Sequence, residues 1–172
     1  DTMWDLVSAQ NTRKYQIIEF LFKSPRPVTI GELASALGAS PRIIQYDLEQ
    51  IKQYISHAKG EIISSHEGIF LYFPTSVGLD HFQRLVFDQS EGFAFLEKVF
   101  FDENMQSEDM INYLFMSESS FRRLVTRLRS SLEEFGLKLE ANPYRIGGPE
   151  SLIRKFFTSY FEERYSVSDW PF

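Results

Sequence analysis

Apolar residues recur along the first sixty positions at the three- and four-residue spacing of amphipathic helices. Residues 12–23 place Tyr15, Ile17, Ile18, Leu21 and Phe22 at helical spacing, and Ser-Pro-Arg-Pro ends this predicted helix. Residues 29–37 predict a short second helix that buries Ile30, Leu33 and Leu37. Thr29 and Glu32 stand three positions apart, the spacing of a capping box.

A third helix is predicted to begin at Pro41, after a tight turn at Gly38, with Ser40 as its N-terminal cap. Its apolar face consists of Ile44, Leu48, Ile51 and Ile55. Residues 61–73 then hold two β-rich runs around His66-Glu67-Gly68, which indicates a hairpin. Three helices followed by a hairpin are the elements of a winged helix-turn-helix.

The same pattern returns 77 positions later. Residues 114–132 align with residues 37–55, so that Ser117 falls on Ser40 and Phe121 falls on Ile44. Residues 91–101 and 107–115 supply two preceding helices, the second capped by Ser107, and residues 137–147 supply a hairpin that turns at Asn142-Pro143. Any two amphipathic helices align at some offset, but here the cap, the apolar positions and the hairpin agree.

The predicted fold class is therefore mainly α with small β-hairpin wings, as two tandem winged helix-turn-helix domains joined by a helical linker. Residues 1–74 form the first domain, 75–89 the linker and 90–148 the second domain. Residues 149–172 form a helix that leads into a further carboxy-terminal region. The chain does not begin with methionine, and we expect it to be part of a longer protein.

The third helix of each predicted domain is the second helix of its helix-turn-helix motif, which lies in the major groove of DNA, so its polar face holds the candidate contacts. In the first domain, Gln45, Tyr46, Glu49, Gln53 and Arg42 share one arc, in which glutamine suits adenine and arginine suits guanine. Asp47 lies off this arc, where a cap or an internal salt bridge is the better interpretation. In the hairpins, Lys59, His66 and Arg145 are candidates for contact with the flanking backbone or the minor groove, although a histidine in a hairpin turn is more often merely exposed.

In the second domain the arc opposite Phe121 contains no acid, whereas ordinary solvated faces mix the two signs of charge. This arc suits phosphates and guanine edges. The complete set of predicted DNA-binding residues is Ser40, Arg42, Gln45, Tyr46, Gln53, Ser117, Ser119, Arg122, Arg123, Thr126, Arg127, Arg129 and Arg145.

The net charge of −6 does not exclude DNA binding, because it is unevenly distributed. Residues 11–60 carry seven Lys and Arg against four Asp and Glu, and residues 111–155 carry eight against five. Residues 80–110 carry eight acids and two bases. Both predicted DNA-binding regions therefore have an excess of basic residues.

An enzyme is not indicated. His57, His66 and His81 have neither metal-ligand nor triad spacing, and Gly147-Gly148-Pro149-Glu150 is too short for a phosphate-binding loop. The sequence predicts no cofactor and no metal.

The absence of cysteine fits a reducing cytoplasm, and no apolar run is long enough to span a bilayer. The alternative to DNA binding is a winged-helix module that binds protein with the same surfaces.

Residues 33–51 resemble the helix-turn-helix of bacterial regulators that contain Ser-x-Arg-Thr-Ile-x-x-Asp-Leu. Ser40, Arg42, Ile44, Asp47 and Leu48 match, whereas Ile43 replaces the threonine. The tandem of two such units, followed by residues 145–165, resembles the amino-terminal half of the Mga-type virulence regulators of Gram-positive bacteria.

This resemblance implies a cytoplasmic transcription activator that binds double-stranded DNA. It also implies a homodimer formed through regions beyond Phe172, where phosphotransferase-regulated domains and their histidines would lie. RNA polymerase and phosphotransferase-system proteins are the further partners that it implies.

Overall fold

The computed structural model describes residues 3–57, 59–74 and 76–165, which divide into two compact units. The first unit is Ala9–Val86. Within the described residues, the second unit combines residues 3–8 with residues 87–165. The chain therefore enters the second unit, leaves it to form the first unit, and returns.

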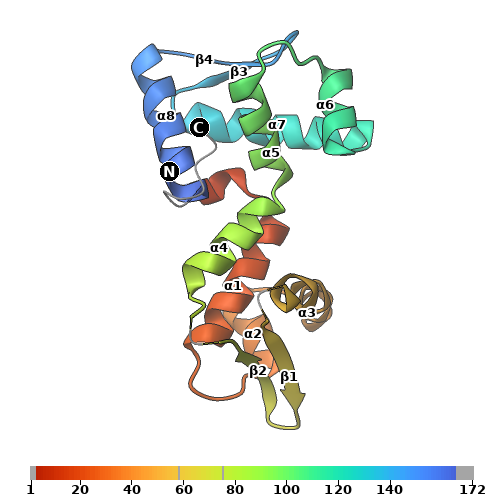
Figure 1. Ribbon diagram of the computed structural model, residues 1–172. Coiled ribbons are helices and arrows are strands. Elements are labelled where there is room, and N and C mark those ends of the chain that lie inside the picture. Colours follow the sequence, from red (N-terminus) through yellow and green to blue (C-terminus); the bar gives the residue numbers. More distant parts are fainter. Residues whose placement is uncertain (1–2, 58, 75, 166–172) are drawn as a thin grey trace. The chain divides into compact units, whose positions relative to one another are not determined.

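In the first unit, three helices precede a hairpin, as the sequence predicts (Figure 1). The helices are α1 (Ala9–Lys23), α2 (Ile30–Leu37) and α3 (Pro41–Ser56), and the strands are β1 (Glu61–Ser65) and β2 (Gly68–Tyr72). The helix α4 (Leu79–Asp88) begins in the first unit and ends in the second. It confirms the helical segment that the sequence predicts after the first hairpin.

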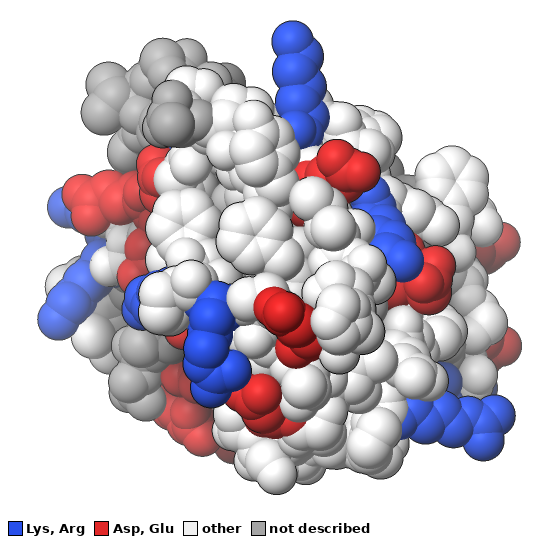
Figure 2. Space-filling view, turned by 90° about the horizontal axis from the view of Figure 1, so that it is seen from below, with Lys and Arg blue, Asp and Glu red and all other residues white. Residues whose placement is uncertain are grey.

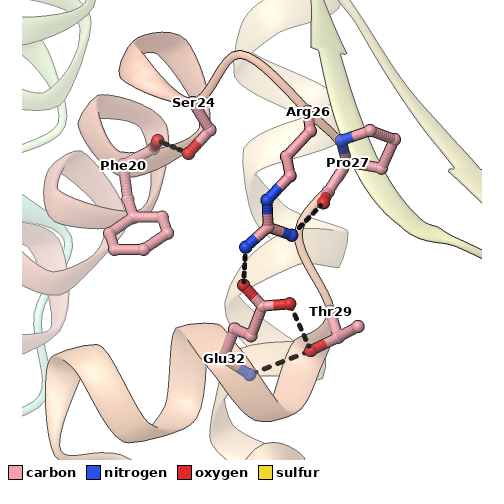
Figure 3. A network of polar contacts seen from close by, with 6 residues as sticks. All are labelled: Phe20, Ser24, Arg26, Pro27, Thr29 and Glu32. Atoms are coloured by element: carbon pink, nitrogen blue, oxygen red, sulfur yellow. Dashed lines mark hydrogen bonds and ion pairs between the residues drawn. The ribbon is translucent and has the colours of Figure 1, made fainter.

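Local capping explains where α2 begins and ends. The Thr29 hydroxyl accepts a hydrogen bond from the Glu32 backbone N–H at 3.1 Å (Figure 3). The Glu32 carboxylate accepts from the Thr29 hydroxyl and from Arg26, each at 3.4 Å. Gly38 ends the helix with φ 65° and ψ 33°, the left-handed conformation that glycine adopts most easily.

The first hairpin is antiparallel, and Ser65 pairs with Gly68 across a turn formed by His66 and Glu67. Ile69 also forms a bridge with Val28, which ties the hairpin to the segment before α2. A Cβ at Gly68 would lie 2.7 Å from the Val28 carbonyl group, and the Gly68 φ is 137°. The short distance and the positive φ both restrict position 68 to glycine. This glycine allows the hairpin to pack closely against the segment before α2.

The core of the first unit confirms the predicted apolar face of α3 and, in part, that of α2. Ile44, Leu48, Ile51 and Ile55 are buried, and Ile17, Ile18 and Leu21 of α1 pack in the same cluster with Leu33 and Phe82. Three residues are less buried than their pattern suggests: Ile30 and Leu37 of α2 are only partly buried, and Phe22 of α1 is 42 % exposed. Helical spacing shows which residues share a face, whereas the segments that pack against that face decide which of them are buried.

The second unit repeats this order of elements. Its helices are α5 (Glu91–Phe101), α6 (Ser107–Leu114), α7 (Glu118–Glu134) and α8 (Glu150–Arg164), and its hairpin consists of β3 (Lys138–Glu140) and β4 (Arg145–Gly147). Phe121, which aligns with Ile44, is buried, and so are the other apolar residues on that side of α7, Leu124, Val125, Leu128 and Leu132. The fold is therefore two helix-turn-helix units with hairpin wings.

The cap of α6 differs from the prediction. Gln106, not Ser107, is the N-cap, and the Asp109 carboxylate accepts a hydrogen bond from the Gln106 backbone N–H at 3.0 Å. The Ser107 hydroxyl instead lies 2.8 Å from the Tyr144 hydroxyl, which belongs to the turn between β3 and β4. Ser107 thus joins α6 to the second hairpin rather than capping the helix.

A 3-10 helix, η1 (Met3–Leu6), packs in the second unit although it precedes α1 in the sequence. Met3, Leu6 and Val7 are buried, and the Trp4 and Phe87 ring centroids lie 4.7 Å apart. The predicted boundaries placed residues 1–74 together, whereas the structure groups this segment with residues beyond Val86. Burial of three apolar side chains accounts for the difference.

Aromatic residues fill the space between α5 and α8. Phe93 and Tyr160 meet edge to face with ring centroids 5.2 Å apart. The Tyr160 hydroxyl donates to Glu97 at 2.9 Å, and the Tyr165 hydroxyl donates to the same carboxylate at 2.5 Å. Because Tyr160 is buried and lies beside Glu97, its pKa is raised well above the ordinary value of a tyrosine.

Candidate nucleic-acid interface

The first candidate surface is the exposed face of α3, whose orientation is set at both the cap and the core. The Ser40 hydroxyl accepts a hydrogen bond from the Ile43 backbone N–H at 3.2 Å, and Pro41 occupies the first turn. Burial of the apolar residues on the opposite side then fixes the rotation of the helix. The exposed side chains of α3 include the predicted Arg42, Gln45, Tyr46 and Gln53, together with Ile43, Glu49 and Lys52.

Asp47 is fully buried on the inner side of α3, and Arg13 of α1 holds it with two hydrogen bonds of 2.5 and 3.2 Å. Asp47 is thus in the internal salt bridge that the sequence favours, and it does not belong to the exposed face. Nearby, the buried Lys14 ammonium donates to the Tyr54 hydroxyl at 3.3 Å, and burial lowers the Lys14 pKa. These contacts lock α3 against α1.

The charge of α3 is weak. Lys52 pairs with Glu49 at 3.0 Å, so each offsets the other. Arg42 is exposed and has no ion-pair partner among the residues that the structure describes. Figure 2, which looks at the molecule from below, shows both signs of charge interspersed with neutral side chains on the face in view. Hydrogen-bonding groups, rather than net charge, therefore characterise α3.

A groove of about 650 Å³ separates α3 from the first wing. Gln45, Glu49 and Lys52 line one side, and Ser64, Ser65 and His66 line the other. His66 lies in the exposed hairpin turn, as predicted, and Lys59 is exposed before β1 with φ 59°. The groove brings the candidate residues of the helix and of the wing to one side of the first unit.

The second candidate surface is the exposed face of α7. The Ser117 hydroxyl caps the helix by accepting from the Ser120 backbone N–H at 3.2 Å. Arg122, Arg123, Thr126 and Arg129 are exposed, as their helical positions predict. Arg122 pairs with Glu118 at 2.7 Å, and Arg123 donates to the Ser120 hydroxyl at 3.1 Å. Such exposed contacts are weak and leave the guanidinium groups accessible.

The remaining hydroxyls of this surface also have internal partners. Thr126 donates to the Arg122 carbonyl at 2.9 Å, and the Ser119 hydroxyl lies 3.4 Å from that of Ser117. In the second wing, Arg145 donates to the Glu140 carboxylate at 2.8 Å, and this hydrogen bond raises the Arg145 pKa. Arg145 is exposed, but its charge is partly offset by Glu140 across the hairpin.

Arg127 does not project freely from the face, in contrast to the sequence interpretation. Its guanidinium donates to the Leu6 carbonyl at 2.6 Å, and burial lowers its pKa. The Ser131 hydroxyl donates to the Asp5 carbonyl at 3.0 Å. These two side chains hold η1 against α7. A helical projection cannot show this, because the partner lies more than 120 positions away in the sequence.

The offset of 77 relates the two surfaces residue by residue. Arg42, Gln45, Tyr46, Glu49 and Gln53 correspond to Ser119, Arg122, Arg123, Thr126 and Ser130, and all ten are exposed. Arg127 corresponds to Gln50, which is half-buried and lies off the polar arc of α3. The two helices thus present equivalent faces with different chemistry: amides and a tyrosine on α3, and guanidinium and hydroxyl groups on α7.

Sequence reasoning missed three residues that shape these surfaces. In the sequence, Arg13 stands out only as part of a helical run. The signal that could have found it is Asp47, because a carboxylate on the inner side of a helix requires a cationic partner. Tyr144 is buried against the loop before α6, and its backbone N–H donates to the Met105 carbonyl at 2.9 Å. Phe115 ends α6 with φ 55° and is 95 % exposed, at the position equivalent to Gly38.

Comparison with known proteins assigns both units. The Mga helix-turn-helix domain matches residues 76–161, half of the chain, and a helix-turn-helix domain family matches residues 13–68. The chain belongs to the Mga helix-turn-helix family. This family consists of DNA-binding regulatory proteins and not of enzymes, so the Mga resemblance of the sequence is confirmed.

Curated relatives carry regulatory names. A protein of Streptococcus pneumoniae serotype 4 described as a trans-acting regulator is 31 % identical over 99 % of this chain and 34 % of its own length. The capsule synthesis positive regulators AcpB and AcpA of Bacillus anthracis are 25 % and 24 % identical, over 93 % and 94 % of this chain and 33 % of their own lengths. The Mga-family chain thus spans about one third of these relatives.

Among solved structures, ScpB from Mycobacterium tuberculosis is 12 % identical with a TM-score of 0.36, over 87 % of this chain and 97 % of that chain. This score is too low to support an argument about the Mga-family chain. Within the described residues, no helix is sufficiently long and apolar to cross a membrane. The same residues contain no cluster of three or more His, Asp or Glu arranged to hold a metal ion.

Proposed function

We propose that this Mga-family chain binds double-stranded DNA sequence-specifically, with α3 and α7 each acting as a recognition helix in the major groove. The observation that carries the proposal is the equivalence of the two exposed faces, each behind a serine cap and opposite a buried apolar stripe. A major groove accommodates one helix, and its base edges distinguish all four base pairs. Two such helices in one chain suit an extended site with two half-sites.

The two helices have different roles in this proposal. Gln45 and Arg42 on α3 suit bidentate contact with adenine and guanine, and Arg42 has no ion-pair partner among the described residues. Arg122, Arg123 and Arg129 on α7 supply positive charge to phosphates and guanine edges. Thus α3 contributes mainly sequence preference, and α7 contributes mainly affinity.

The remaining predicted contacts complete the interface at its edges. Tyr46, Gln53, Ser119 and Thr126 lie on the same exposed faces, and Arg145 approaches the flanking backbone from the second wing. The hydroxyls of Ser40 and Ser117 are occupied as caps, so their helix N-termini contact phosphate through backbone N–H groups. In this proposal Arg127 holds η1 through its hydrogen bond to the Leu6 carbonyl and does not contact phosphate.

In the whole protein we propose transcription activation in the cytoplasm, because two of the relatives are named positive regulators. A homodimer, RNA polymerase and phosphotransferase-system proteins are the proposed partners. The alternative is a winged-helix module that binds protein only. The exposed guanidinium groups of α7 favour DNA, because several arginines exposed on one helix complement the negative charge of the phosphate backbone.

Binding-site selection from a random duplex library tests the proposal. The change Arg42→Ala with Gln45→Ala should relax the sequence preference at the positions that α3 reads, at about 1–3 kcal/mol for each lost bidentate contact. Total affinity should fall less than preference, because phosphate contacts on α7 remain. The matched control is Arg26→Ala, an exposed arginine outside both recognition helices. A double variant that selects the same sequences as the wild type would contradict base reading by α3.

A further inference from the structure

Ile43 is an exposed isoleucine on the helix that carries the first set of candidate DNA contacts. Its side chain is 41 % exposed in the first turn of α3, whereas the next residue, Ile44, is fully buried. The Ile43 backbone N–H donates to the Ser40 hydroxyl at 3.2 Å, so the cap fixes the position of this residue. A β-branched side chain is not favoured at an exposed helical position. The stability of α3 therefore gives no reason for an isoleucine here.

Tyr46 lies beside Ile43 on the surface of α3 and is 56 % exposed. Residues three positions apart are neighbours on a helix, separated by about 60° around its axis. The equivalent residues of α7 are in direct contact, because Arg123 donates to the Ser120 hydroxyl at 3.1 Å. Ile43 and the ring of Tyr46 thus form an exposed apolar pair, the Ile43–Tyr46 edge, which borders the polar face of α3.

The helix-turn-helix fold does not impose this apolar pair. At the same two positions α7 carries the hydroxyl of Ser120 and the guanidinium of Arg123, and its cap and buried stripe match those of α3. The Ile43 side chain has no hydrogen-bonding group, so it can bond neither to phosphate nor to a polar base edge. What it offers on this face is contact with an apolar group.

The major groove presents one such group. Its base edges are hydrogen-bond donors and acceptors, except for the C5-methyl group of thymine, which is read by apolar contact. Residues near the N-terminus of a recognition helix contact the base edges, and Ile43 lies in the first turn of α3. Arg42 and Gln45, which stand next to the two members of the edge in the sequence, suit guanine and adenine. The Ile43–Tyr46 edge suits thymine, which these two side chains leave unread.

We propose that the Ile43–Tyr46 edge contacts the C5-methyl group of a thymine in the DNA site that α3 reads. This inference rests on the proposed function as a sequence-specific DNA-binding protein, and it names a base by which the site is chosen. The contact removes water from two apolar surfaces, so burial rather than charge supplies its share of the affinity. This share should therefore not depend on salt as phosphate contacts do.

Replacement of thymine by deoxyuridine tests the inference, because it removes the methyl group and leaves the base pairing unchanged. A duplex obtained by binding-site selection is prepared with each thymine replaced in turn, and the Kd of the wild type is measured for each duplex. At one or two positions we expect binding to weaken about fourfold, the effect of burying one methyl-sized group. The other replacements should leave the Kd unchanged.

Ile43→Ser should bind the thymine duplex about fourfold more weakly than the wild type. It should show no further loss with deoxyuridine, because the methyl group has already lost its partner. Serine preserves the fold, since Ser120 occupies the equivalent position of α7, and circular dichroism checks this. Ile43→Ser combined with Tyr46→Arg gives α3 the pair that α7 has and should likewise be insensitive to deoxyuridine.

Ile63→Ser is the matched control, because Ile63 is also an exposed isoleucine, with 43 % of its side chain exposed, but lies on β1. It should keep the deoxyuridine sensitivity of the wild type.

Three results would overturn the inference. A wild type that is indifferent to deoxyuridine at every position would show that no methyl group is read. Sensitivity that persists in both Ile43 variants would assign the methyl contact to other residues. An indifferent wild type, together with a smaller oligomer of Ile43→Ser in sedimentation, would place the edge on a second copy of the chain. If the wild type selected no sequence from the library, the proposed function would fail before deoxyuridine is tried, which separates the two failures.

Discussion

Ser40 and Ser117 lie 77 positions apart and form the same contact. Each hydroxyl accepts a hydrogen bond, 3.2 Å long, from the backbone N–H three residues later, at the start of α3 and of α7. Their backbones agree as well, with φ −73° and −75° and ψ 152° and 157°. The repeat inferred from the sequence is therefore present at the level of individual atoms.

Removal of either cap should destabilise its own unit by a similar amount. Ser40→Ala and Ser117→Ala should each lower the free energy of unfolding by about 1 kcal/mol, because one backbone N–H loses its partner. Ser→Asp at either position should retain the stability, since a carboxylate accepts the same hydrogen bond. Urea unfolding followed by circular dichroism measures both. A cap variant as stable as the wild type would contradict the assignment of that serine.

The buried pair of Arg13 and Asp47 should behave asymmetrically. Arg13→Met should cost about 3 kcal/mol, because it leaves the buried carboxylate without a partner. The second unit has a buried leucine, Leu124, at the position equivalent to Asp47. Arg13→Met combined with Asp47→Leu should therefore recover most of the loss, because an apolar pair replaces the ionic one. If the double variant were no more stable than Arg13→Met alone, the pair would not be the source of the cost.

Arg127 and Arg123 should differ in what they stabilise, although both lie on α7. Arg127→Ala removes the hydrogen bond to the Leu6 carbonyl and should lower the free energy of unfolding by about 1–2 kcal/mol. Arg123→Ala removes an exposed side chain and should change it by less than about 0.5 kcal/mol. Limited proteolysis provides an independent measurement, since the bond after η1 should be cut faster in Arg127→Ala only. Equal stability of the two variants would exclude the structural role of Arg127.

Much of this architecture was predictable because it depends on local pattern. The caps at Ser40 and Ser117 and the apolar stripes of α3 and α7 follow from spacing within one helix, and all are confirmed. Contacts that close over long sequence separations were not predictable. The hydrogen bond from Arg127 to Leu6 and the role of Ser107 beside Tyr144 depend on segments that fold back from elsewhere in the chain. The same limitation applies to Phe22, whose exposure is decided by its neighbours rather than by its helix.

Stability should fall at alkaline pH because of the two tyrosines that donate to Glu97. Burial, first of all, and the neighbouring carboxylate raise the pKa of Tyr160 and of Tyr165 above the ordinary value of 10.0. In the unfolded chain these phenols ionise as the pH rises through that value, whereas the folded chain must keep them protonated. Their contribution is thus fully present below the unfolded pKa and is lost as the pH rises above it.

Urea unfolding at a series of pH values between neutral pH and strongly alkaline pH measures this contribution. Tyr160→Phe should be less stable than the wild type at neutral pH, because its hydrogen bonds to Glu97 and to the Phe93 carbonyl are lost. It should also lose stability less steeply at alkaline pH, because one phenol no longer ionises. Parallel curves for the two proteins would contradict the linkage.

The salt dependence of DNA binding tests the central claim most directly. A labelled duplex is titrated with the wild type and with Arg122→Ala combined with Arg123→Ala, at several salt concentrations. Each arginine on a phosphate adds about one unit to the slope of log K against log salt, so we expect the double variant to lose up to about two units. The control Arg154→Ala, an exposed arginine on α8, should keep the wild-type slope. An unchanged slope in a folded double variant would contradict the DNA-facing role of α7 and favour the protein-binding alternative.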